Sequence, residues 1–264
     1  MMYVLILTLL ASTHCVSPVD MDVWDELLDT NFKIIGGQDA KDGDNPHMCS
    51  VRTDGWHVCG ASIISDQWVV TAAHCVLNYG THIVVNGSFT LHCGTIERSR
   101  GGVDYEVNKI IFNELYNWIG PNDIALLKIK QNFPLGTKYI NTIQMATKDT
   151  DVAPGSLVKA IGWGLINQTT YPEILQTLDV PVIERSKCEV IYKNYFNMTV
   201  DETSICAGGE GREPCSADSG SPLTINKTLV GITVWTKPCA HPGYPTVYTR
   251  VSKYRDWIRN HTGI

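Results

Sequence analysis

The apolar residues of this chain gather in short runs of strand length, and this pattern excludes most architectures. Runs of four to seven mostly apolar residues, many of them β-branched, lie at 61–64, 68–71, 124–129, 157–161, 178–183, 229–235 and 247–251. Strands of this length at such intervals favour a barrel or a sandwich over a parallel sheet. Only the final segment, 252–261, has helical spacing, with Tyr254, Trp257 and Ile258 three and four residues apart. We therefore predict an all-β protein with a docked C-terminal α-helix.

Length and charge restrict the number of domains and the kind of partner. The 264 residues suit one large all-β domain or two small ones, and the polar stretch 148–156 is the natural joint between two halves. The composition, 44% hydrophobic and 18% charged, is typical of a folded protein. The formal charge is −6 and no basic stripe occurs, which argues against a nucleic-acid partner.

Residues 1–17 have the pattern of a secretory signal peptide. An apolar run at 4–10 is followed by small residues and is far too short to span a bilayer. No other segment of the sequence reaches transmembrane length. We therefore expect a secreted, extracellular protein without a membrane partner.

The cysteine count agrees with export. Cys15 would leave with the signal peptide, and the eight remaining cysteines are an even number, which favours disulfides in an oxidising compartment. The alternative is a metal site, but the sequence has no Cys-x-x-Cys and no paired histidine spacing, so we expect no metal. Five glycosylation sequons begin at Asn86, Asn167, Asn197, Asn226 and Asn260.

Three short motifs carry the chemistry. Ser219 follows an acidic residue and precedes a glycine, just before an apolar strand. A serine hydroxyl is a weak nucleophile that needs a base, and the base needs a group that orients it. His74, in Ala-Ala-His-Cys, and Asp123, in Asn-Asp-Ile-Ala, are the candidates. A lone histidine is more often a structural residue and a lone aspartate a cap, but the three contexts together favour catalysis.

In this order and context, the three motifs resemble those of the chymotrypsin/trypsin-type serine proteases, which include the insect-type chymotrypsin-like members. The resemblance covers the chain from residue 34 to about 261. The resemblance implies an all-β fold of two six-stranded antiparallel Greek-key β-barrels, with the active site between them and a C-terminal α-helix, in a peptidase domain at 34–264. It also implies a monomer that needs no cofactor. Its partners would be protein or peptide substrates and protein protease inhibitors.

The same resemblance assigns the catalytic roles. Ser219 would attack the scissile carbonyl to form an acyl-enzyme, His74 would accept its proton, and Asp123 would orient His74. The backbone N–H groups of Ala217 and Ser219 would form the oxyanion hole. The site would therefore belong to a serine endopeptidase.

A precursor form is implied by the segment before residue 34. Residues 18–33 resemble an activation propeptide, which a trypsin-like protease would cut after Lys33. The new ammonium group of Ile34 would then pair with Asp218, because a buried charge is costly unless it is paired. Before cleavage, the family often holds that aspartate on residues that match His57 and Ser50 here.

The resemblance also indicates a substrate pocket and a set of disulfides. Glu213 would lie at the floor of the pocket, and Trp235, Thr236 and Thr246 would line its walls. The acidic floor would favour basic side chains of the substrate, whereas the two threonines would make the pocket restricted. Of these alternatives, we expect the restricted pocket. Family pairing implies Cys59–Cys75, Cys188–Cys206 and Cys215–Cys239. Cys49 and Cys93 match no universal family pair, but they would lie on neighbouring strands of the first barrel, so we predict a fourth bridge.

Departures from the family pattern keep a second function open. Ala217 replaces the glycine of the oxyanion hole, Ser221 replaces the glycine two residues after the nucleophile, and Val234 replaces a serine that commonly binds the catalytic aspartate. These changes motivate the alternative of a protease-like homologue with weak or no activity that acts as a binding or decoy protein. A purely structural extracellular glycoprotein would leave the activation motif unexplained.

Overall fold

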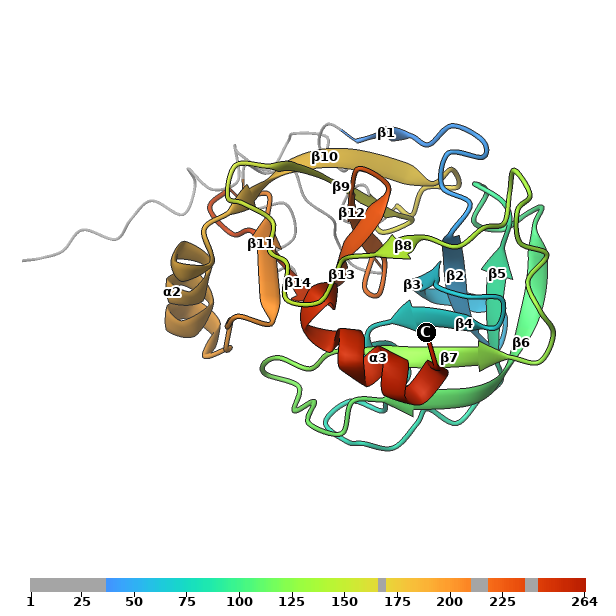
Figure 1. Ribbon diagram of the computed structural model, residues 1–264, viewed down its shortest axis with the longest axis horizontal. Coiled ribbons are helices and arrows are strands. Elements are labelled where there is room, and N and C mark those ends of the chain that lie inside the picture. Colours follow the sequence, from blue (N-terminus) through green and yellow to red (C-terminus); the bar gives the residue numbers. More distant parts are fainter. Residues whose placement is uncertain (1–36, 166–169, 210–217, 236–241) are drawn as a thin grey trace, which may run out of the picture. The chain divides into compact units, whose positions relative to one another are not determined.

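The computed structural model describes residues 37–264 except 166–169, 210–217 and 236–241, all within one compact unit that spans 32–264. Six of the described strands close into an antiparallel barrel in the order β2-β3-β4-β7-β6-β5 (Figure 1). Their bounds are β2 Met48–Thr53, β3 Trp56–Ile63, β4 Trp68–Thr71, β5 Phe89–Cys93, β6 Val103–Phe112 and β7 Ala125–Ile129.

A second set of described strands forms the other barrel. Its ring runs β10-β11-β14-β13-β12-β9, and the antiparallel pairing of β9 with β10 closes it. The bounds are β9 Leu157–Gly162, β10 Gln176–Ile183, β11 Ser204–Ala207, β12 Pro222–Ile225, β13 Thr228–Trp235 and β14 Thr246–Arg250. Two short strands attach to this ring: β1 (Gln38–Asp39) pairs with β10, and β8 (Gln144–Met145) pairs with β13. The predicted fold of two six-stranded barrels is confirmed.

Each of the seven predicted runs lies on a strand, because apolar side chains define the faces that the barrels bury. Along β10, the more buried and more exposed positions alternate, as expected for a strand with one face on the core. The four residues of β4 are buried throughout, which agrees with the apolar run Trp68–Val70 and with the single polar residue, Thr71, at its end. Strand β6 was not predicted, since half of its ten residues are exposed and only one is buried; its pairing with both β5 and β7 holds it in the barrel.

The C-terminal helix forms as predicted, and a second helix, which the apolar pattern did not indicate, precedes it in the chain. A 3₁₀ turn, η2 (Val251–Tyr254), leads into α3 (Arg255–Thr262), whose Ile258 is fully buried. Another helix, α2 (Arg185–Phe196), buries only Cys188 and Tyr192. With so narrow an apolar stripe, its sequence carries little periodicity. None of the described helices is long and apolar enough to cross a membrane.

Disulfides hold several of these elements together. Within the described residues, Cys49–Cys93 joins facing positions of β2 and β5, Cys59–Cys75 joins β3 to the turn after β4, and Cys188–Cys206 joins α2 to β11. These are three of the four predicted pairs. Cys215 and Cys239 lie outside the described residues.

Arg250 anchors the segment that joins the two barrels. Its side chain is buried, and its guanidinium group donates hydrogen bonds to the carbonyl oxygens of Asp149, Thr150 and Glu202. It also forms an ion pair of 3.0 Å with Asp151. A buried cation is tolerated when its donors are matched in this way. The polar joint expected at 148–156 is therefore held against the end of β14.

His47 makes the stability of this fold depend on pH. It lies just before β2, only 7% exposed, and its Nε2 has no hydrogen-bond partner among the described residues. Burial lowers the pKa of His47 from 6.5 to about 4. The unfolded chain therefore binds a proton on His47 more tightly than the folded protein does. As a result, the free energy of unfolding keeps its full value above pH 6.5 and falls by roughly 3 kcal/mol as the pH is lowered towards 4.

We expect His47→Gln to flatten this acid dependence, because glutamine does not titrate. The free energy of unfolding in urea, measured at several pH values between about 7 and 4.5, would fall less steeply in the variant than in the unmodified protein. Equal slopes in the two proteins would show that other groups cause the acid loss.

Candidate active site

His74 and Asp123 form a tightly held pair on the first barrel. His74 lies in the 3₁₀ turn η1 (Ala73–Cys75), directly after β4, and Asp123 lies just before β7, the neighbour of β4. The backbone N–H of His74 donates to Asp123 Oδ1 at 3.0 Å, and the ring Nδ1–H donates to Oδ2 at 2.6 Å. These two bonds fix the ring orientation and leave Nε2 as the nitrogen that can accept a proton.

The environment of this pair sets its charge. Asp123 is 1% exposed, and its backbone oxygen accepts a hydrogen bond from Thr249 Oγ1 at 2.8 Å, across from the second barrel. Burial alone would lower the pKa of His74, but the charge of Asp123 and the hydrogen bond to it outweigh burial, so the pKa of His74 is raised. The pair therefore stabilises a positive charge on the imidazole.

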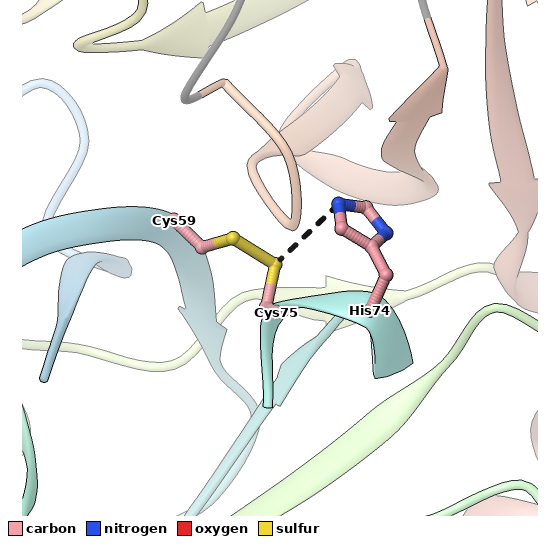
Figure 2. Close-up of side chains that lie close together, drawn as sticks. All are labelled: Cys59, His74 and Cys75. Atoms are coloured by element: carbon pink, nitrogen blue, oxygen red, sulfur yellow. Dashed lines mark hydrogen bonds between the residues drawn. A yellow bond between two sulfur atoms is a disulfide. The ribbon is translucent and has the colours of Figure 1, made fainter. Parts of the chain in front are cut away.

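A disulfide borders the other side of the imidazole. Cys59 and Cys75 are bonded to each other, and His74 Nε2 lies 3.9 Å from the Cys75 sulfur (Figure 2). These three side chains have the spacing of a metal site. Because the sulfurs are joined in a disulfide, they offer no thiolate ligands, and this cluster does not suit a metal ion.

The turn that carries Ser219 docks on the first barrel through backbone contacts. Gly60, on β3 next to Cys59, donates its N–H to the Ser219 carbonyl at 2.8 Å. The Gly60 carbonyl accepts a hydrogen bond from Thr71 Oγ1 at 2.7 Å. Thr71 ends β4, three residues before His74, so one peptide group contacts both the serine turn and the segment that leads to the histidine.

Because Gly220 has no side chain, the serine turn can lie directly against the backbone of the first barrel. Its φ of +77° lies in the left-handed region, and a Cβ there would overlap Thr71 Oγ1 and the Gly60 carbonyl and would lie 3.3 Å from the backbone nitrogen of Ala72. Its N–H donates to Thr233 O at 2.7 Å, which fixes the turn to β13. The structure thus brings the Ser219 turn against the backbone two residues before His74.

Two glycines form a niche for Asp218. Its carboxylate is buried, and Oδ1 accepts the N–H of Gly164 at 2.7 Å. A Cβ on Gly162 or on Gly164 would overlap this carboxylate. The sequence analysis missed both glycines, although they flank the buried Trp163. Ile34, the predicted partner of Asp218, lies outside the described residues.

The other predicted positions divide into described and undescribed ones. His57 and Ser50 are joined by a hydrogen bond of 2.7 Å, and Trp235 and Thr246 are buried. Glu213, Ala217 and Thr236 lie outside the described residues. Four of the five sequon asparagines are described and exposed: Asn86, Asn197, Asn226 and Asn260. The fifth, Asn167, lies outside the described residues.

The two remaining departures from the family pattern are packed in the interior. Ser221 is buried, and its Oγ, which has no hydrogen-bond partner among the described residues, occupies the space that a Cβ on Gly60 would need. Val234 is also buried. The missing Cβ of Gly60 therefore accommodates the larger residue at position 221.

Comparisons with known proteins cover the segment that carries this site. A family model described as trypsin matches residues 34–258. An anionic trypsin of Canis lupus familiaris is 37% identical over 238 residues, covering 88% of this chain and 90% of the relative. Trypsin Tyr p 3.0101 of Tyrophagus putrescentiae is 36% identical over 269 aligned residues, covering 98% and 90%. A vitellin-degrading protease of Bombyx mori is 32% identical over 232 residues, covering 86% and 85%.

We expect Gly220→Ala to destabilise the protein far more than Gly155→Ala. Both glycines have positive φ, +77° and +83°, so both alanines pay the left-handed backbone cost of about 1–2 kcal/mol. Only the alanine at 220 would also meet backbone atoms, since no atom lies within 4 Å of a Cβ at 155. Urea unfolding of the two variants measures the difference, which we expect to exceed about 2 kcal/mol; equal losses would contradict the close docking.

Proposed function

Because the chain belongs to the trypsin family of serine proteases, we propose that it is a secreted serine endopeptidase that acts through His74, Asp123 and Ser219. The observation that carries this proposal is the His74–Asp123 pair, bonded at 2.6 Å, beside the backbone on which the Ser219 turn docks. A base that is already oriented by a buried carboxylate is what a serine nucleophile needs.

The proposed reaction follows from this geometry. His74 Nε2 accepts the proton of Ser219 as the serine oxygen attacks the scissile carbonyl, and the resulting imidazolium is stabilised by Asp123. His74 then gives the proton to the leaving amine, which leaves an acyl-enzyme on Ser219. Water, activated by the same imidazole, releases the acid. The N–H groups of Ser219 and Ala217 would stabilise the oxyanion at both steps.

We further propose that the protein is made as a zymogen. After a trypsin-like protease cuts behind Lys33, the ammonium group of Ile34 would pair with Asp218. The proposal is supported by the burial of Asp218, which is 2% exposed, and by the niche that Gly162 and Gly164 leave for its carboxylate. Because Asp218 directly precedes Ser219, holding this carboxylate also holds the nucleophile and the backbone donors beside it.

The pocket and the surface support two finer proposals. Thr246 is fully buried and pairs in register with Ala207 on β11. Its methyl group would narrow the pocket beside Trp235, so we propose that small side chains are preferred over long ones before the scissile bond. The exposed asparagines 86, 197, 226 and 260 would accept N-linked glycans in the secretory compartment.

A fluorophosphonate probe tests the proposed nucleophile directly. We expect it to label Ser219 in protein that has been cut after Lys33 and whose measured N-terminus is Ile34. Ser219→Ala should abolish labelling and lower kcat by about 10⁶-fold. Ser221→Ala is the matched control, because it removes a buried hydroxyl from the same segment and should keep the label. Correctly processed protein that stays unlabelled would favour the binding or decoy alternative.

The pH dependence tests the role of His74. The base must be neutral to accept a proton, and its pKa is raised above 6.5, so kcat/KM should decline on the acid side with an apparent pKa above 6.5. Protonation of His74 has the opposite effect on the stability of the fold, which it increases. The folded state binds this proton more tightly, so the stability contribution of the protonated pair is present below pH 6.5 and is lost as the pH rises through the folded pKa. A kinetic pKa below 6.5 would contradict this assignment.

A further inference from the structure

A cavity of about 840 Å³ lies between the C-terminal helix α3 and the segment 141–148. This volume is in the range of small-molecule binding sites. None of the residues that line the cavity belongs to the candidate active site. The charged side chains of the lining are Lys148, Arg255, Asp256 and Arg259. Its uncharged polar side chains are Asn141, Thr142, Gln144 and Thr147.

The charge of this cavity is positive. Lys148 and Asp256 form an ion pair of 2.5 Å, so their charges cancel. Within the part of the chain that the structure describes, neither Arg255 nor Arg259 forms an ion pair with a carboxylate. Two arginine charges in the lining are therefore left without a matching anion.

Arg255 lacks the acceptors that its burial calls for. Its side chain is half-buried, and among the described residues its hydrogen bond is from Nη1 to the Met145 sulfur, at 2.9 Å. A thioether sulfur is a weak acceptor, whereas a guanidinium group carries five N–H donors. Burial, together with the positive charge of Arg259, lowers the pKa of Arg255. An anion in the cavity would offset both effects.

The donors of the cavity suit a tetrahedral oxyanion better than a carboxylate. A guanidinium group binds an anion through two parallel N–H···O bonds, which occupy both oxygens of a carboxylate. Arg259 follows Arg255 by four residues, so both lie on the same face of α3. A sulfate or phosphate group has further oxygens for this second arginine. The amides and hydroxyls of the lining match the hydroxyl groups of a sugar.

We propose that this cavity binds a sulfate or phosphate group carried by a sugar-sized molecule, with Arg255 as the bidentate donor and Arg259 as the second cation. The protein as a whole has a formal charge of −6, so a general attraction for anions does not account for such binding. The inference does not depend on the proposed function, because the cavity shares no residue with the proposed active site.

The test measures binding by isothermal titration calorimetry to the full chain carrying Ser219→Ala, so that turnover plays no part. The probes are inorganic sulfate, N-acetylglucosamine 6-sulfate and glucose 6-phosphate, with the ionic strength held constant because screening alone changes such affinities. Arg255→Gln removes the guanidinium group and keeps a polar side chain. Arg100→Gln is the matched control, because it removes an equal charge from an exposed arginine that pairs with Glu97 at 3.1 Å and does not line the cavity.

We expect Arg255→Gln to raise the dissociation constant of the sugar esters by about 10-fold or more, as for the loss of hydrogen bonds to a charged group. Arg100→Gln should leave it nearly unchanged. Thermal unfolding establishes that the variants are folded. Should Arg255→Gln not fold, Arg259→Gln on the exposed side of α3 gives the same comparison, with an expected increase of about 3-fold.

The probes also separate the two sources of the anion. Sugar esters that bind more tightly than inorganic sulfate would support a ligand whose sugar contacts the polar lining. Equal affinities for the ester and the free ion would overturn the sugar part of the proposal. Absence of binding to any probe, or an equal loss in Arg255→Gln and Arg100→Gln, would overturn the site itself.

Discussion

The hydrogen bond from Gly60 N–H to the Ser219 carbonyl is the contact on which the site depends. His74 and Asp123 belong to the first barrel, whereas Ser219 belongs to the second, so neither barrel contains the site by itself. The peptide group of Gly60 reaches both, since its carbonyl accepts Thr71 Oγ1 while its N–H binds the serine turn. The disulfide at the adjacent Cys59 ties the same strand to the turn of His74. A single stretch of β3 thereby sets the separation between base and nucleophile.

Buried charges mark the places where separate segments meet. Asp123 lies between the barrels, Asp218 fills a niche beside β9, and Arg250 holds the joint around Thr150. Each is matched by backbone groups, which are fixed in position by the fold and lose little entropy on binding the charge. Such groups add less to net stability than apolar packing does, but they allow few alternative arrangements of the segments that they join.

Local sequence signals predicted the parts of this fold that depend on local chemistry. The run at 68–71 coincides with β4, and the contexts of His74, Asp123 and Ser219 identified three residues whose supporting elements the structure brings together. Helix α2 and strand β6 escaped prediction because pairing, a disulfide and a few buried residues hold them, rather than an apolar pattern.

The supporting residues of the site were harder to foresee for a related reason. Gly60, Gly162 and Gly164 matter because a side chain there would overlap another residue, and the atoms that it would overlap most closely belong to Ser221 or Asp218, 54 to 161 positions away in the sequence.

The contact between Gly60 and Ser221 has a consequence for how this sequence can change over time. A Cβ at position 60 and the hydroxyl at 221 would claim the same space. Substitution at either position is therefore conditional on the other: a residue larger than glycine on β3 would need position 221 to lose its side chain and its backbone to shift as well. Among descendants of this protein, these two sites, on different barrels and 161 residues apart, should covary.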